Sequence, residues 1–281
     1  MTVADQALID EALAALGAAD KGVIGAPGGQ KAVRLVEHAG TTCVAKVVAV
    51  GHTSDDTLTS ARREVELLAG IDSPNVVKVE SALVTIGEPV RGAAWLEEYL
   101  DGEDLGPLLG GREWTWAEAR QMGTDVSNGL AEGHARKVIH RDLSANNVRQ
   151  LSDGTYKVLD FGFARHTLRS QVTFNGQPGT PGFLSPEHLN SYSGGPATMS
   201  DVFQVGNLMY CALTRTLPYP YTGDDADYIS RLRTGTMTPL SVARPDLTAE
   251  QLAVVNRALH PQPARRFINA ASLRDALVRT P

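Results

Sequence analysis

The stretch that decides the fold reads Val138-Ile139-His140-Arg141-Asp142-Leu143-Ser144-Ala145-Asn146-Asn147, followed after a Ser152-Asp153-Gly154 turn by Lys157-Val158-Leu159-Asp160-Phe161-Gly162. Its polar residues lie next to short β-type runs. The pattern predicts a loop-strand-turn-strand-loop unit whose open ends present side chains to a cleft. We therefore expect Asp142, Asn147 and Asp160 to belong to one site.

These three side chains have the chemistry of phosphoryl transfer. That reaction needs one carboxylate near the attacking hydroxyl and hard oxygen ligands that hold magnesium against the phosphates. Asp142 fits the first role, and Asn147 and Asp160 fit the second. Each residue taken alone is more ordinary, because a single Asp or Asn in a loop is usually a solvated turn residue.

Two separate motifs in a fixed order are stronger evidence for a shared site than any single residue. His-Arg-Asp-Leu-x-x-x-Asn ends at Asn147, and Asp-Phe-Gly begins thirteen residues later at Asp160. With these motifs the chain resembles the eukaryotic-type (Hanks-type) serine/threonine protein kinases of bacteria, over roughly residues 20–279. The resemblance implies a bilobal α+β fold with the nucleotide between the lobes. A β-rich N-lobe with one key helix would span residues 1–99, with an extra helix at about residues 4–16, and a mainly helical C-lobe would span residues 100–281.

Composition and charge favour a soluble globular protein. The 281 residues are 42% hydrophobic and 21% charged, and the net charge of -6 argues against a nucleic-acid or acidic-membrane partner. Cys43 and Cys211 are too few and too far apart for a disulfide framework or a zinc site, so we expect a cytoplasmic protein. No leader or membrane-spanning run is present, and the ends favour a complete domain.

The resemblance assigns the catalytic roles. Asp142 would accept the proton of the substrate hydroxyl, while Asn147 and Asp160 would hold Mg²⁺, with Mn²⁺ as the alternative. Lys46 would bind the α and β phosphates of ATP, and Glu64 would clamp that lysine. The positions expected to contact the nucleotide are Gly28, Gly29, Lys31, Val33, Val44, Lys46, Glu98, Leu100, Asp104 and Arg149.

A polar segment after Phe161 resembles a kinase activation loop. Its candidate phosphosites are Thr167, Ser170 and Thr173, which Arg141 and Arg165 would grip through charge-assisted hydrogen bonds. The run from Gly179 to Glu187 matches the substrate-docking loop. Within this run, Thr180 would position the substrate hydroxyl. Farther along the chain, Asp201 would brace the catalytic loop, and Arg266 would pair with Glu187.

Four departures from the kinase pattern keep other functions open. Ser144 replaces a lysine, Glu97 is the gatekeeper, and the glycine-rich loop is degenerate. Arg149 lies where an apolar residue usually supports adenine, and it would stack on the base or pair with Glu97. The first expectation is an autophosphorylating Ser/Thr kinase acting on proteins. The alternatives are a pseudokinase-like binding module or a small-molecule phosphotransferase, which the docking loop disfavours. The oligomeric state stays open.

Overall fold

The structure is a computed structural model, and it describes residues 4–24, 31–50, 55–161, 182–189 and 195–281. It divides the chain into two compact units. Unit 1 comprises Met1–Asp72 and Val77–Asp101, and unit 2 comprises Ser73–Val76 and Gly102–Pro281. No helix among the described residues has the length and apolar character needed to cross a membrane.

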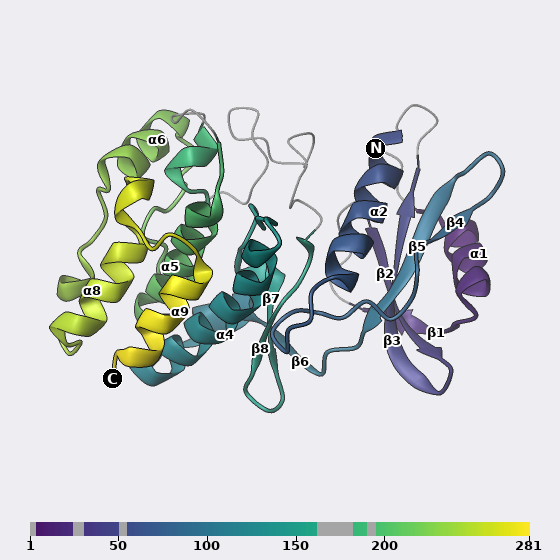
Figure 1. Cartoon of the computed structure of the whole chain (residues 1–281), viewed down its shortest axis with the longest axis horizontal. Helices are drawn as coiled ribbons and strands as arrows, with labels where there is room; N and C mark the ends of the chain where they lie inside the picture. The colour runs from purple at the N-terminus through teal and green to yellow at the C-terminus, as the bar shows by residue number, and fades with distance from the viewer. Residues whose placement is uncertain (1–3, 25–30, 51–54, 162–181, 190–194) are drawn as a thin grey trace. The chain divides into compact units, whose positions relative to one another are not determined.

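Unit 1 is an antiparallel sheet with a helix on each face (Figure 1). Its elements are α1 (Gln6–Leu16), β1 (Ala19–Val23), β2 (Lys31–His38), β3 (Thr41–Ala49), α2 (Asp55–Ala69), β4 (Val84–Ile86) and β5 (Gly92–Glu98). The strand order is β1-β2-β3-β5-β4, and every neighbouring pair is antiparallel. Because successive side chains of a strand point to opposite faces, each strand contributes to two separate cores.

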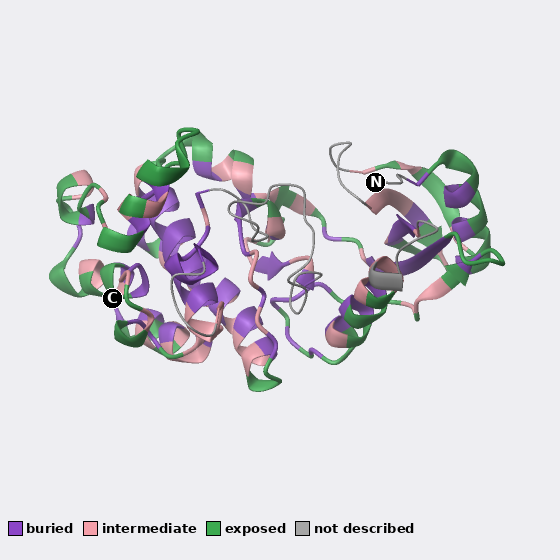
Figure 2. Ribbon diagram, turned by 90° about the horizontal axis from the view of Figure 1, so that it is seen from above, coloured by how far each residue is buried: buried purple, intermediate pink, exposed green. Residues whose placement is uncertain are grey.

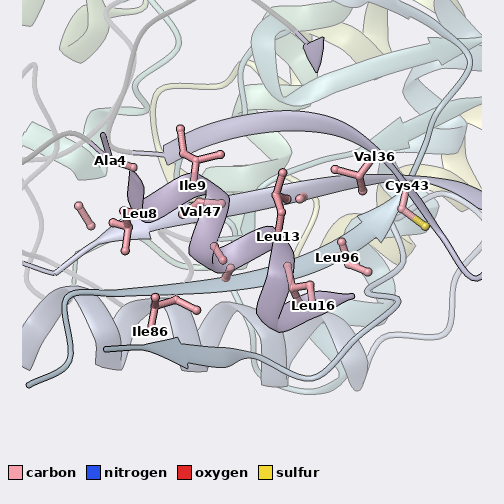
Figure 3. Close-up of a cluster of buried hydrophobic side chains, with 14 residues drawn as sticks. Ala4, Leu8, Ile9, Leu13, Leu16, Val36, Cys43, Val47, Ile86 and Leu96 are labelled. Atoms are coloured by element: carbon pink, nitrogen blue, oxygen red, sulfur yellow. The ribbon is translucent and has the colours of Figure 1, made fainter. Parts of the chain in front are cut away.

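The first core lies between the sheet and α1. Asp5 caps the helix by accepting the N–H of Leu8 at 2.8 Å, and Gly17 ends it in the left-handed region at φ 63. Figure 3 shows the buried side chains of this core, which come from α1, β2, β3, β4 and β5. Gly92 fits this packing because a Cβ there would lie 2.9 Å from the Val48 carbonyl oxygen and 2.8 Å from Leu8 Cδ1.

The second core lies on the opposite face, under α2. It contains Val48, Ala61, Val65, Ala93 and Trp95. The strand register places Val33 opposite Lys46, and Lys46 opposite Trp95, so these three side chains lie on the α2 side of the sheet. Two polar side chains on this face of the sheet, Lys46 and Glu97, are buried beneath the helix.

Unit 2 is mainly helical. Its helices are α3 (Leu105–Gly111), α4 (Trp116–Ala135), α5 (Thr198–Thr214), α6 (Asp225–Thr234), α7 (Leu240–Ala243), α8 (Ala249–Ala258) and α9 (Ala270–Arg279). Its short strands β6 (Gly102–Asp104), β7 (Val148–Leu151) and β8 (Tyr156–Val158) form one antiparallel sheet. In the part of unit 2 that the structure describes, the 3-10 helices are η1 (Ala145–Asn147), η3 (Pro186–Leu189) and η4 (Pro263–Arg265).

Helix α5 is the core of unit 2. All residues from Ser200 to Leu213 are buried, and α4, α8 and α9 pack around it (Figure 2). A helix that is buried on every side must satisfy its polar side chains internally. Its first two turns carry Ser200, Asp201 and Gln204, so this end of the helix can bind polar groups of neighbouring loops. The expected α+β class, with a β-rich first part and a mainly helical second part, is confirmed.

The packing of α1 predicts that Leu13→Ala destabilises unit 1. Leu13 is 4% exposed within the first core, and truncation of a buried leucine costs about 2–5 kcal/mol. The measurement is the free energy of unfolding in urea. Val23→Ala is the matched control, because Val23 is 66% exposed on β1 and its truncation costs no more than about 0.5 kcal/mol. Equal losses in the two variants would contradict the packing role of α1.

Candidate active site

The loop that carries Asp142 is held by the buried carboxylate of Asp201. Asp201 Oδ2 accepts the N–H of His140 at 2.8 Å, and Oδ1 accepts the N–H of Arg141 at 2.9 Å. The Nε2–H of His134 donates to Oδ2 at 2.8 Å. Burial by itself would raise the pKa of Asp201, but the hydrogen bonds from His134 and Arg141 outweigh it and hold the pKa below its ordinary value. The expected bracing role of Asp201 is confirmed.

His188 and Gln204 fix the same loop through the Arg141 carbonyl. Gln204 Nε2 donates to this oxygen at 3.3 Å, and His188 Nε2 lies 2.8 Å from it. The other ring nitrogen, Nδ1, accepts the N–H of Ser185 at 3.1 Å. Since Nδ1 is an acceptor, the hydrogen-bond network assigns the proton to Nε2, and His188 is a neutral donor to Arg141.

Hydrogen bonds also join the loop to the end of β8. Asn147 Nδ2 donates to the Asp142 carbonyl at 2.8 Å, and the Asn147 carbonyl accepts the N–H of Leu159 at 2.9 Å. His140 Nε2 lies 3.0 Å from the Leu159 carbonyl. The chain segments that carry Asp142, Asn147 and Asp160 are thus tied together within unit 2, although their sequence positions span two motifs.

Arg141 and Asp160 have left-handed backbones, with φ 69 and 54. Such conformations cost a residue other than glycine about 1–3 kcal/mol and persist only where surrounding contacts impose them. Three described residues with positive φ that are not glycine lie elsewhere: Ala39, Lys137 and Arg215. Strained backbone immediately before Asp142 and at Asp160 itself is typical of positions whose side chains must point in a fixed direction.

Asn147 and Asp160 fit a hard divalent cation. The Nδ2 of Asn147 is engaged by the Asp142 carbonyl, so Oδ1 is the atom of that amide suited to a metal, and Asp160 offers carboxylate oxygens. Within the described ranges, three or more His, Cys, Asp or Glu side chains nowhere gather as a metal-binding group. Mg²⁺ does not need such a group, because it usually keeps waters and phosphate oxygens beside one or two protein ligands.

Arg149 and Asp104 bind each other across β6 and β7. Arg149 Nη1 lies 2.7 Å from Asp104 Oδ1, and Nη2 donates to the Gly102 carbonyl at 2.6 Å. The strand register directly opposes the two residues. Glu97, the other partner considered for Arg149, instead accepts hydrogen bonds from Lys46 and Trp95. Two expected nucleotide contacts of unit 2 therefore form one ion pair at the strand edge.

Unit 1 pairs its lysines differently from the sequence expectation. Lys46 Nζ is 3.7 Å from Glu64 Oε1 but only 2.9 Å from Glu97 Oε1. Glu64 is instead bound closely by Lys31, whose Nζ lies 2.7 Å from each carboxylate oxygen. The Lys46–Glu64 contact is thus present, but it is longer than the Lys46–Glu97 and Lys31–Glu64 contacts.

The remaining expected nucleotide contacts of unit 1 follow its strand pairing. Val33 opposes Lys46, and Val44 opposes Glu97, so both valines lie on the α2 face. At the end of β5, the N–H of Glu98 donates to the Lys78 carbonyl at 2.9 Å, and Leu100 is 7% exposed. Seven predicted residues lie outside the described ranges: Gly28, Gly29, Arg165, Thr167, Ser170, Thr173 and Thr180.

The predicted Glu187–Arg266 pair is confirmed. Arg266 Nη1 and Nη2 lie 2.7 and 2.9 Å from the two oxygens of Glu187, in a bidentate contact that is almost fully buried. Ser200 Oγ also donates to Glu187 Oε1 at 2.9 Å. This pair anchors η3, and η3 carries His188. Sequence reasoning missed His188, although a histidine directly after the predicted buried Glu187 was an available signal.

His188 predicts a loss of stability in mild acid. Burial lowers its pKa below the ordinary 6.5. As the pH falls below about 6.5, the imidazole binds a proton in the unfolded chain but stays neutral in the folded chain. The contribution of His188 to the free energy of unfolding is therefore fully present above this pH and declines below it. The limiting slope is about 1.4 kcal/mol per pH unit. His188→Gln keeps an N–H donor and should flatten the pH dependence of the free energy of unfolding between about pH 7 and 5.5.

The control for this measurement is Val242→Gln, which introduces the same side chain at a 69% exposed position of α7 in unit 2 and removes no titratable group. This variant should keep the parental slope. An unchanged slope in His188→Gln would show that the buried imidazole does not titrate in this range.

Comparison with known proteins places the chain in a family. The protein kinase domain model matches residues 19–276. A probable serine/threonine-protein kinase of Streptomyces coelicolor is 30% identical over 76% of this chain and 32% of its own length. PknB, a probable serine/threonine-protein kinase of Bifidobacterium longum, is 28% identical over 88% of this chain and 37% of its own. The kinase pkn2 of Myxococcus xanthus is 30% identical over 77% and 26%. This chain thus spans about a third of these relatives. It belongs to the protein kinase domain family, in the group of eukaryotic-type serine/threonine kinases of bacteria.

Proposed function

We propose that this chain is an ATP-dependent protein kinase that transfers the γ-phosphoryl group to serine or threonine hydroxyls. Protein kinases use ATP and a divalent metal ion, and the family implies protein substrates. The observation that carries the proposal is the hydrogen-bonded loop of unit 2. There Asp201 fixes the strained backbone before Asp142, and Asn147 joins the Asp142 carbonyl to the end of β8, next to Asp160.

Asp142 is the proposed catalytic residue. Its carboxylate would accept the proton of the attacking hydroxyl and hold that oxygen in line with the γ-phosphorus. Asn147 and Asp160 would hold Mg²⁺, which neutralises phosphate charge when it is bound, and Mn²⁺ is the alternative ion. Fixed positions are important here, because catalysis of phosphoryl transfer is mostly positioning and electrostatic stabilisation.

Residues with proposed nucleotide roles occur in each unit. Lys46 and Glu64 would act on the phosphates, and the backbone of residues 98–100 would meet adenine. Asp104 would lie near the ribose, with Arg149 held beside it by their ion pair. The other proposed contacts are Gly28, Gly29, Lys31, Val33, Val44, Glu98 and Leu100. In this proposal residues 1–99 act as the N-lobe and residues 100–281 as the C-lobe.

Regulation would act on the segment between Phe161 and Gly182. We propose autophosphorylation at Thr167, Ser170 or Thr173, with Arg141 and Arg165 binding the phosphate and Thr180 positioning the substrate hydroxyl. The buried free thiols Cys43 and Cys211 suit the reducing cytoplasm, where we expect the reaction to occur.

The experiment that tests this function is incubation of the purified chain with radiolabelled ATP and Mg²⁺, beside Asp142→Ala. The parent should label itself on Thr167, Ser170 or Thr173. Asp142→Ala should show at least about a hundredfold less transfer, because the group beside the attacking hydroxyl is lost, with ATP affinity within about twofold of the parent. Scintillation counting, peptide mapping and calorimetry with ATP provide the three readouts.

Asp153→Ala is the matched control, because Asp153 lies in an exposed turn and binds Thr155. Its transfer rate should equal that of the parent. Full activity in Asp142→Ala would remove Asp142 as the base. A folded parent that labels neither itself nor generic protein substrates would favour the binding-module alternative.

A further inference from the structure

Four ionisable side chains gather on the α2 face of the sheet in unit 1. Val33 opposes Lys46 in the register of β2 and β3, and Lys31, two residues earlier on β2, lies on the same face. Lys46 opposes Trp95 on β5, and Glu97 follows two residues later, again on that face. Glu64 reaches them from α2. We call Lys31, Lys46, Glu64 and Glu97 the charged cluster.

The charged cluster is buried and closely coupled. Side-chain exposures are 2% for Glu64, 4% for Glu97, 11% for Lys46 and 23% for Lys31. The ammonium groups of Lys31 and Lys46 lie 5.5 and 6.0 Å from the centroid of the Trp95 ring, within the range of cation–π attraction. Trp95 Nε1 also donates to Glu97 Oε1 at 2.9 Å. The Trp95 indole therefore contacts both ammonium groups and also the Glu97 carboxylate.

The distances divide the cluster into two close pairs. Lys31 binds both oxygens of Glu64 at 2.7 Å, and Lys46 binds Glu97 at 2.9 Å, whereas Lys46 and Glu64 are 3.7 Å apart. Among these four side chains, Lys31 balances the charge. Glu97 adds a buried negative charge beside Lys46 and Glu64, and the charges of these three side chains sum to -1 when Lys31 is left out. Such a group would repel phosphates, and a buried unbalanced charge is costly.

We propose that Lys31 and Lys46 both bind the nucleotide phosphates, with Glu64 as the clamp of Lys31 and Glu97 as the clamp of Lys46. This inference rests on the proposed function of the same site and extends it from one phosphate-binding lysine to two. Lys31 is the more exposed of the two and begins β2 directly after Gly28-Gly29-Gln30. Glu97 is a positioning residue, since it acts through Lys46 and not on the nucleotide.

The test is calorimetric titration of the full chain with ATP–Mg²⁺ and with adenosine. The ratio of the two dissociation constants isolates the phosphate contribution, which a merely structural change does not alter. Lys31→Met should weaken ATP binding at least about tenfold, the effect expected for one lost hydrogen bond to a charged group, and leave adenosine binding unchanged. Lys21→Met is the matched control, because Lys21 on β1 is 48% exposed and pairs with Glu37 at the surface.

The double variant Lys31→Met/Glu97→Gln decides between phosphate binding and charge balance. It restores the charge balance of the cluster and keeps an acceptor for Trp95, so it also guards against a folding defect in Lys31→Met. Because Glu97 positions Lys46, the single variant Glu97→Gln is the reference, and a loss of ATP affinity in the double variant relative to Glu97→Gln supports the proposal. Recovery to within about twofold of the parent would overturn it, because Lys31 would then only neutralise Glu97. Unchanged ATP affinity in Lys31→Met would also overturn it.

The experiments distinguish a failure of the proposed function from a failure of the two-lysine inference. If the parent binds ATP without transferring phosphate, the proposed function fails, and the affinity ratio still tests Lys31. If the parent transfers phosphate and Lys31→Met retains parental ATP affinity, only the two-lysine inference fails. A folded parent that binds no ATP would overturn both.

Discussion

The hydrogen bonds between Asp201 and the backbone of His140 and Arg141 are the interaction on which the candidate active site depends. Arg141 is in a left-handed conformation that its side chain does not favour, and a loop with that strain would relax if nothing opposed it. Asp201 opposes it from the first turn of the fully buried helix α5. The position of Asp142 is therefore set by the packing of unit 2 as a whole, and the loop itself could not maintain it.

Other hydrogen bonds connect the loop that carries Asp142 to elements beyond α5. His188 binds the Arg141 carbonyl from η3, and η3 is anchored by the Glu187–Arg266 pair. The structure thus connects the segment that resembles the substrate-docking loop to the catalytic loop through one neutral imidazole. A shift of η3 can therefore displace the backbone beside Asp142 through the hydrogen bond of His188.

In unit 1 the constraint is charge balance, because charged side chains are buried beneath a helix. A lysine under α2 must be balanced by a carboxylate, and Glu97 on β5 adds a second carboxylate to the same layer. Lys31 restores the balance from β2. The face opposite is apolar and covered by α1 (Figure 3), so the alternation along each strand separates a structural core from a charged one.

Much of this protein is determined by sequence alone. Alternation predicts the strands, and the spaced motifs around Asp142 and Asp160 indicate the family, the bracing role of Asp201 and the Glu187–Arg266 pair. These features depend on local spacing and on motifs with fixed geometry. The tertiary structure alone decided which carboxylate each lysine meets, that Arg149 binds Asp104, and that His188 holds the catalytic loop. The physical reason is that an ion pair or hydrogen bond forms with the nearest partner in space, and strand register and helix packing set that distance to within an ångström.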